Sequence, residues 1–123
     1  MQTNKQAKKR ILFAGGGTGG HIFPAIALAE EFLTRPWFEV LFVGTKSGIE
    51  HTVIPKAGYP FKTVLVSGFM KKNPLQVLLG IFKLFIAFFQ SLSILLHYQP
   101  NLVIGVGGYA SGPIVLLARC LGF

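Results

Sequence analysis

Glycines dominate a short segment near the amino terminus that ends in a histidine. The segment reads Gly15-Gly16-Gly17-Thr18-Gly19-Gly20-His21. Glycine has no Cβ and permits positive φ, so backbone N–H groups of such a segment can point at the oxygens of a phosphate. A tight strand-to-helix turn needs fewer than five glycines in six residues. We therefore favour an anion-binding loop over a purely structural turn.

The histidine that closes this segment is a candidate general base. An imidazole can take a proton from a hydroxyl group near neutral pH. His21 also stands where the loop meets the helix expected to follow it, whose amino end carries a partial positive charge. On the residues alone, a structural histidine at a helix start is the favoured interpretation.

A second glycine-rich segment lies near the carboxyl end of the chain. It reads Gly105-Val106-Gly107-Gly108-Tyr109-Ala110-Ser111-Gly112-Pro113. We expect Ser111 to cap the next helix and Pro113 to lie in the first turn of that helix. Two such loops at one edge of a sheet suit a ligand that carries a diphosphate, or two ligands that meet there.

Apolar runs and breakers alternate along the chain and predict the elements that position these loops. We expect strands at 10–14, 39–43, 61–66 and 102–106, and helices at 21–33, 49–56, 75–98 and 113–121. Such alternation is typical of an α/β fold, a Rossmann-like parallel sheet with helices on both faces. Right-handed crossovers bring the carboxyl ends of all strands to one edge, where both glycine loops open.

The composition is that of a basic and strongly apolar domain. Of 123 residues, 51% are hydrophobic and 13% are charged, and the formal net charge is +8. This indicates apolar surface that another domain, a membrane or both would cover, and an anionic partner. No aromatic RNA-binding motif or zinc-finger spacing is present, so we expect phosphate and membrane partners and no nucleic acid. Cys120, the single cysteine, allows no internal disulfide and is expected in the core.

Two other phosphate-binding classes compare poorly with the first glycine loop. Gly15, Gly17 and Gly20 satisfy the spacing of a dinucleotide-binding fingerprint. The second strand, however, is followed by Gly44-Thr45-Lys46, with no acidic residue to hold a ribose. A P-loop is excluded because no Gly-Lys-Ser or Gly-Lys-Thr follows the glycines.

The apolar stretch 75–96 is long enough to span a bilayer, and its only charge is Lys83. A spanning helix would separate two strands of one sheet, so we expect peripheral contact with an anionic leaflet instead. The residues expected at the membrane are Phe69, Lys71, Lys72, Leu75, Leu79, Phe82 and Lys83. The alternative is burial of this stretch against a neighbouring domain.

At the two glycine loops the sequence resembles a known family. Gly-Gly-Thr-Gly-Gly-His at 16–21 and Gly-Gly-Tyr-Ala-Ser-Gly-Pro at 107–113 resemble the MurG family of UDP-N-acetylglucosamine:undecaprenyl-pyrophosphoryl-muramoyl-pentapeptide N-acetylglucosaminyltransferases. The similarity runs from about Arg10 to the last residue. The resemblance implies a GT-B fold of two Rossmann-like domains. It also implies inverting transfer of GlcNAc from UDP-GlcNAc to lipid I, which gives lipid II in peptidoglycan synthesis, with no cofactor and no metal.

The same resemblance implies roles for individual residues. It assigns His21 as the catalytic base, although the family's Glu-Gln-Asn segment, which follows the position of Phe123, is the alternative source of the base. It assigns the donor UDP-GlcNAc to Thr18, Gly19 and Gly20. It assigns the acceptor and its diphosphate to Gly16, Gly17, Gly108, Tyr109, Ser111 and Gly112.

The family pattern continues past Phe123 into a donor-binding domain that this sequence does not include. We therefore expect residues 1–9 to be a basic leader and residues 10–123 to be a truncated amino-terminal, acceptor-binding domain. The resemblance implies a peripheral position at the cytoplasmic face of the bacterial inner membrane. Its partners would be UDP-GlcNAc, undecaprenyl-linked lipid I, the anionic membrane surface and the donor domain. The alternatives are a non-catalytic fragment that binds membrane or lipid diphosphate, or, ranked lower, a dinucleotide-binding module.

Overall fold

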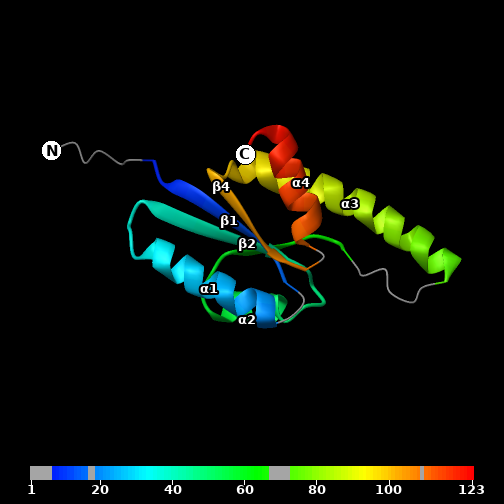
Figure 1. The fold of residues 1–123 in the computed structure, drawn as a ribbon, viewed down its shortest axis with the longest axis horizontal. Coiled ribbons are helices and arrows are strands. Elements are labelled where there is room, and N and C mark those ends of the chain that lie inside the picture. The colour runs from blue at the N-terminus through cyan, green and yellow to red at the C-terminus, as the bar shows by residue number, and fades with distance from the viewer. Residues whose placement is uncertain (1–6, 17–18, 67–72, 109) are drawn as a thin grey trace.

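The computed structural model describes residues 7–16, 19–66, 73–108 and 110–123. The elements are β1 (Lys9–Gly15), α1 (Gly19–Leu33), β2 (Phe38–Gly44), α2 (Glu50–Lys56), β3 (Phe61–Thr63), α3 (Pro74–Tyr98), β4 (Leu102–Gly107) and α4 (Ser111–Leu121). The strands form one parallel sheet in the order β3-β2-β1-β4 (Figure 1). The predicted parallel α/β architecture is confirmed.

Helices cover both faces of the sheet, and each face has its own apolar core. Side chains of β1 alternate between the two cores, Leu12 and Ala14 entering one and Ile11 and Phe13 the other. Helices α3 and α4 cover the first face, and α1 and α2 cover the second (Figure 1). Because the central strands are buried on both sides, their sequences read as continuous apolar runs.

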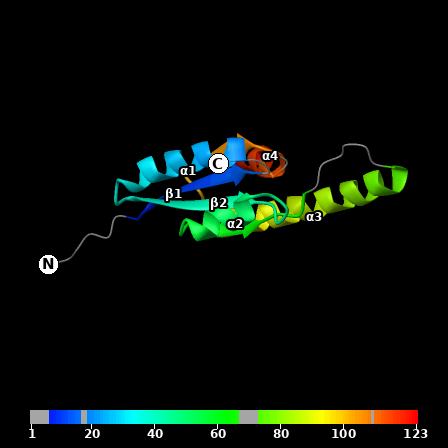
Figure 2. The same cartoon turned by 90° about the horizontal axis from the view of Figure 1, so that it is seen from below.

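Helix α3 is anchored at one end and protrudes at the other (Figure 2). It begins with a capping box in which Gln76 N donates to Asn73 Oδ1 at 2.8 Å and Asn73 N donates to Gln76 Oε1 at 3.3 Å. Its carboxyl half buries Ala87, Ser91, Ile94 and Leu95. By length and composition alone the helix is apolar and long enough to cross a membrane, although its carboxyl half packs on the sheet.

Two elements differ in extent from the sequence-based prediction. Strand β3 ends at Thr63 instead of residue 66, because the next free amide, that of Leu65, donates to Oε1 of Gln90 on α3 at 2.7 Å. Helix α1 begins at Gly19 instead of His21, and Pro24 lies inside it. Proline has no N–H, and the carbonyl of Gly20 therefore receives no helical hydrogen bond from it.

Two side-chain predictions are wrong. Ser111 does not cap α4, because it is the first residue of that helix and its hydroxyl donates to the carbonyl of Gly108 at 3.0 Å. Cys120 is exposed and not in the core, because the inward-facing positions of α4 fall on Ile114, Leu117 and Ala118. Gly122, in the left-handed conformation, ends α4.

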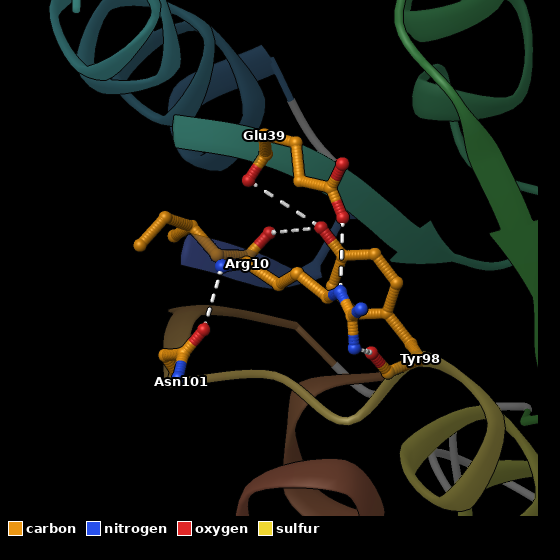
Figure 3. Close-up of polar contacts among 5 residues, drawn as sticks. Arg10, Glu39, Tyr98 and Asn101 are labelled. Atoms are coloured by element: carbon orange, nitrogen blue, oxygen red, sulfur yellow. Dashed lines mark hydrogen bonds and ion pairs between the residues drawn. The ribbon is translucent and has the colours of Figure 1, made fainter. Parts of the chain in front are cut away.

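A polar cluster ties the strands together at the amino end of the sheet (Figure 3). Arg10 Nε pairs with Glu39 Oε1 at 3.1 Å, and Arg10 Nη1 donates to the carbonyl of Tyr98 at 2.9 Å. The Tyr98 hydroxyl donates to the carbonyls of Ile11 and Glu39 at 3.3 and 3.4 Å. Asn101 Oδ1 accepts from Arg10 N at 2.8 Å. We call Arg10, Glu39, Tyr98 and Asn101 the amino-edge cluster.

Candidate functional site

The two glycine loops meet at the carboxyl edge of the sheet, as expected from the strand order. Gly15 lies opposite Gly107 where the register of β1 and β4 shifts, and Gly16 N donates to Gly107 O at 3.2 Å. Gly108 has a φ of +82°, and a Cβ there would overlap the carbonyl oxygen of Gly16. Only a glycine permits this backbone conformation and this approach. The close packing therefore depends directly on the missing side chains.

His21 lies where the two loops meet. It is in the first turn of α1, and its ring is exposed. A Cβ on Gly107 would stand 3.0 Å from Cδ2 and 3.1 Å from Nε2 of that ring. The imidazole thus lies against the bare backbone of the second loop. An exposed imidazole in this position can exchange a proton with a ligand bound across both loops.

The amino end of α4 presents backbone donors beside these loops. Among the residues that the structure describes, no side chain caps this helix, whose flanking residue is Ala110, and its first turn holds no acid. The Ser111 hydroxyl is directed to the carbonyl of Gly108, which holds the loop against the helix. Uncapped N–H groups at a helix start favour an anion, both as donors and through the helix dipole.

The structure describes some of the predicted site residues and not others. Gly16, His21, Gly108, Ser111 and Gly112 lie along the two loops and the starts of α1 and α4. Gly19 and Gly20 open α1. The predictions for Gly17, Thr18, Phe69, Lys71, Lys72 and Tyr109 fall outside the described residues.

The residues expected at the membrane fall into two groups. Leu75, Leu79 and Phe82 are 65%, 53% and 66% exposed on the protruding half of α3. Lys83 is half-buried and lines a cleft of about 490 Å³ with Lys46 and Gln90, at the β3 edge of the sheet. Lys83 therefore stands beside the exposed apolar surface and not within it.

Sequence reasoning missed Glu50. It is the first residue of α2, and its side chain is completely buried beside the first glycine loop. Glu50 belongs to no recognised motif, but one signal was available. The chain has only four acidic residues, and this one follows the apolar Ile49 and opens a short helix just after β2. Across the described residues, no group of three or more His, Cys, Asp or Glu side chains is placed to hold a metal ion.

Comparison with known proteins identifies the family of this chain. Residues 11–122 match the model of the glycosyltransferase family 28 N-terminal domain. The chain belongs to this family. The family 28 domain is 54% identical over 114 residues to the UDP-N-acetylglucosamine--N-acetylmuramyl-(pentapeptide) pyrophosphoryl-undecaprenol N-acetylglucosamine transferase of Myxococcus xanthus. It is 50% identical over 114 residues to the protein of the same name from Geobacter sp. strain M21.

These similarities cover most of this chain but only part of each relative. The chain is covered to 92% by both relatives, yet it spans about 30% of the length of the curated relatives it matches. A crystal structure of MurG from Acinetobacter baumannii superposes with a TM-score of 0.79 at 29% identity, covering 94% of this chain and 33% of that one. The resemblance to the MurG family and its Rossmann-like fold are thereby confirmed.

Proposed function

We propose that this family 28 domain is the acceptor-binding half of an enzyme that transfers GlcNAc from UDP-GlcNAc to lipid I, forming lipid II. The observation that carries the proposal is the meeting of two bare glycine loops with His21 at one edge of the sheet. A lipid diphosphate and a sugar hydroxyl are the acceptor groups that such an edge would bind. The names of the 50–54% identical relatives supply the substrates.

In the proposed transfer, the first loop contacts both donor and acceptor, and the second loop contacts the acceptor. The acceptor hydroxyl attacks the anomeric carbon of GlcNAc, the new C–O bond forms with inversion, and the bond to UDP breaks. His21 takes the proton of the attacking hydroxyl. In this proposal the donor is contacted by Thr18, Gly19 and Gly20. The acceptor and its diphosphate are contacted by Gly16, Gly17, Gly108, Tyr109, Ser111 and Gly112.

An apolar groove beside the second loop suits the lipid part of the acceptor. A groove of about 580 Å³ runs between α3 and α4 from Gly112 and Pro113 to Leu116, Phe85 and Phe89. A diphosphate held at the start of α4 would direct an attached undecaprenyl chain into this groove. Apolar side chains would then contact the chain, and its burial would be favourable by about 25 cal/mol per Å².

A liposome assay tests the proposed activity. Liposomes that contain lipid I are mixed with UDP-GlcNAc and either this chain or a complete enzyme that joins this domain to a donor-binding domain. We expect lipid II from the complete enzyme only, because stabilisation of the departing UDP needs preorganised groups that we assign to the donor domain. Robust lipid II formation by the 123-residue chain, or none by the complete enzyme, would contradict the proposal.

We further propose that the protein binds the cytoplasmic face of the inner membrane peripherally. The protruding half of α3 would dip into the leaflet, while its carboxyl half stays packed on the sheet. Lys71, Lys72 and Lys83 would add roughly 1 kcal/mol each near an anionic surface. High salt should therefore weaken binding and leave an apolar remainder. If neither high salt nor carbonate removes any protein from the membrane, α3 spans it and the proposal fails.

Paired substitutions on α3 locate the membrane surface. Leu79→Gln should reduce co-flotation with anionic liposomes several-fold, because it removes apolar area from the protruding half. Leu96→Gln is the control, since Leu96 is 51% exposed against 53% for Leu79 but lies at the anchored end of the helix. Equal losses for the two variants would place the contact elsewhere.

A further inference from the structure

The carboxylate of Glu50 is completely buried beside the carboxyl ends of β1 and β2. Its Oε1 accepts hydrogen bonds from the amide of Thr45 at 3.0 Å and from the hydroxyl of Thr45 at 2.9 Å. The same hydroxyl accepts from the amide of Gly48 at 3.2 Å, which closes the loop between β2 and α2. Removing a carboxylate from water is costly unless such bonds replace its hydration. The bonds from Thr45 replace that hydration at Oε1 and hold the carboxylate in one position.

Three glycines from separate segments face the side chain of Glu50. A Cβ on Gly16, after β1, or on Gly48, before α2, would overlap the carboxylate. A Cβ on Gly44, the last residue of β2, would lie 2.6 Å from Cγ of Glu50 and 2.9 Å from the carbonyl of Gly15. The carboxylate thus fills the space left by three missing side chains, and the first glycine loop lies directly against it.

The contacts continue from Glu50 to the imidazole. Gly16 lies against the carboxylate on one side and donates its N–H to Gly107 on the other. The carbonyl of Gly16 also fixes how closely Gly108 approaches. Gly107 in turn lies against the ring of His21. The backbone of Gly16 and the backbone of Gly107 therefore connect the buried carboxylate to His21.

We propose that Glu50 is a positioning residue. It sets the position of the Gly15–Gly16 segment, and through that segment the position of Gly107, Gly108 and the His21 imidazole. The proposal rests on the function proposed for His21. A reacting group displaced by about 1 Å can lose on the order of 10²-fold in rate. A support made of a carboxylate and bare backbone leaves little freedom for such a displacement.

Kinetics of a complete enzyme containing this domain test the proposal. Glu50→Ala leaves a void under Gly16 and should lower kcat/KM about 10²-fold, mainly through kcat. Glu50→Gln keeps the volume and one acceptor for Thr45, and should recover at least about 10-fold of that loss. Glu39→Gln makes the same change at the opposite end of the sheet and should leave kcat/KM within about 2-fold. Thermal denaturation of each variant ensures that only folded enzyme is compared.

A second variant and a second measurement keep the test decisive. If Glu50→Ala does not fold, Thr45→Val removes only the hydroxyl bonds and should lower kcat/KM about 10-fold. The second measurement is amide hydrogen exchange of the 123-residue chain, which does not depend on enzyme activity. There, Thr45→Val should speed exchange at Gly16 more than at Phe13, which lies in the core of β1.

The outcomes separate this inference from the proposed function. Folded Glu50→Ala enzyme with normal kcat/KM, Glu50→Gln no better than Glu50→Ala, or no selective change in exchange at Gly16 would each overturn the positioning role. A wild-type enzyme that does not transfer GlcNAc would overturn the proposed function instead. The exchange result at Gly16 would still stand in that case.

Discussion

The two ends of this sheet use polar groups in opposite ways. At the amino end, Arg10, Glu39, Tyr98 and Asn101 bond to one another and to the backbone (Figure 3). At the carboxyl end, glycines leave backbone amides beside an exposed imidazole, and the one acid nearby is buried beneath them. In the function that we propose, the dense polar network is structural and the bare backbone at the strand ends binds the ligand.

The amino-edge cluster connects elements that are far apart in sequence. Arg10 is on β1, Glu39 on β2, Tyr98 ends α3, and Asn101 precedes β4. Each intramolecular hydrogen bond contributes about 1 kcal/mol net. The Arg10–Glu39 ion pair adds less than its geometry indicates, because the two side chains are 41% and 39% exposed. We therefore expect this cluster to affect stability and not turnover.

The largest expected effect is at the carboxyl end. In a complete enzyme containing this domain, His21→Ala should lower kcat about 10²- to 10⁴-fold with little change in the donor KM, because a general base acts in the transition state. His97→Ala is the control, since His97 is exposed at the far end of α3. Steady-state kinetics with lipid I and UDP-GlcNAc measure kcat and KM for both variants. Near-normal kcat for His21→Ala would leave that histidine a structural residue.

The second-largest expected effect distinguishes the contact between the two glycine loops from backbone strain at a single glycine. Gly108→Ala forces a Cβ onto the carbonyl of Gly16 at a φ of +82°, so we expect a loss of about 1–3 kcal/mol of stability and at least ~10-fold weaker acceptor binding. Gly58→Ala has comparable strain, with a φ of +90°, but its Cβ would meet no atom within 4 Å. It should lose stability alone. Equal effects of the two variants on the acceptor KM would contradict the account.

A smaller effect is expected at the amino end. Arg10→Ala removes the ion pair with Glu39 and the bond to the Tyr98 carbonyl, and should lower the free energy of unfolding by about 1–2 kcal/mol. Turnover should not change. Urea denaturation measures the first quantity and the lipid II assay the second. A loss of turnover beyond the loss of folded protein would show that the two ends of the sheet are coupled.

The smallest effect appears only at high pH. Burial, and then the charge of Glu39, raise the pKa of Tyr98, so the folded state binds the phenolic proton more tightly than the unfolded state. The resulting stability is fully present below the unfolded pKa of about 10 and is lost as pH rises above it. Tyr98→Phe should therefore flatten the fall in stability above about pH 10. An unchanged alkaline profile in that variant would assign the fall to other groups.

The order of elements was predictable because each buried strand is a short apolar run ended by breakers. The length of β3 was overestimated because the amide of Leu65 donates to the side chain of Gln90, which lies on a helix distant in sequence. Ser111 was misassigned because a serine two residues before a proline resembles a cap whichever carbonyl its hydroxyl reaches.

The candidate site was predictable only in part. The glycine loops and His21 are visible as local patterns in the sequence. Glu50 is not, because its neighbours come from the loop after β1, from the end of β2 and from the loop after β2. Its burial also depends on glycines, and the sequence alone does not show which residues contact a glycine. A buried acid held by backbone therefore becomes apparent only once the chain is folded.

The most direct test of the central claim is a nuclear magnetic resonance titration of the 123-residue chain. The ligand is a water-soluble, short-chain analogue of the muramyl-pentapeptide prenyl diphosphate acceptor. We predict the largest amide shift changes at Gly16, His21, Gly107 and Gly108, and changes near zero at the amino-edge cluster. Saturable shifts centred on Arg10 and Asn101, or none at the glycine loops at millimolar ligand, would contradict the assignment of the acceptor to the carboxyl edge of the sheet.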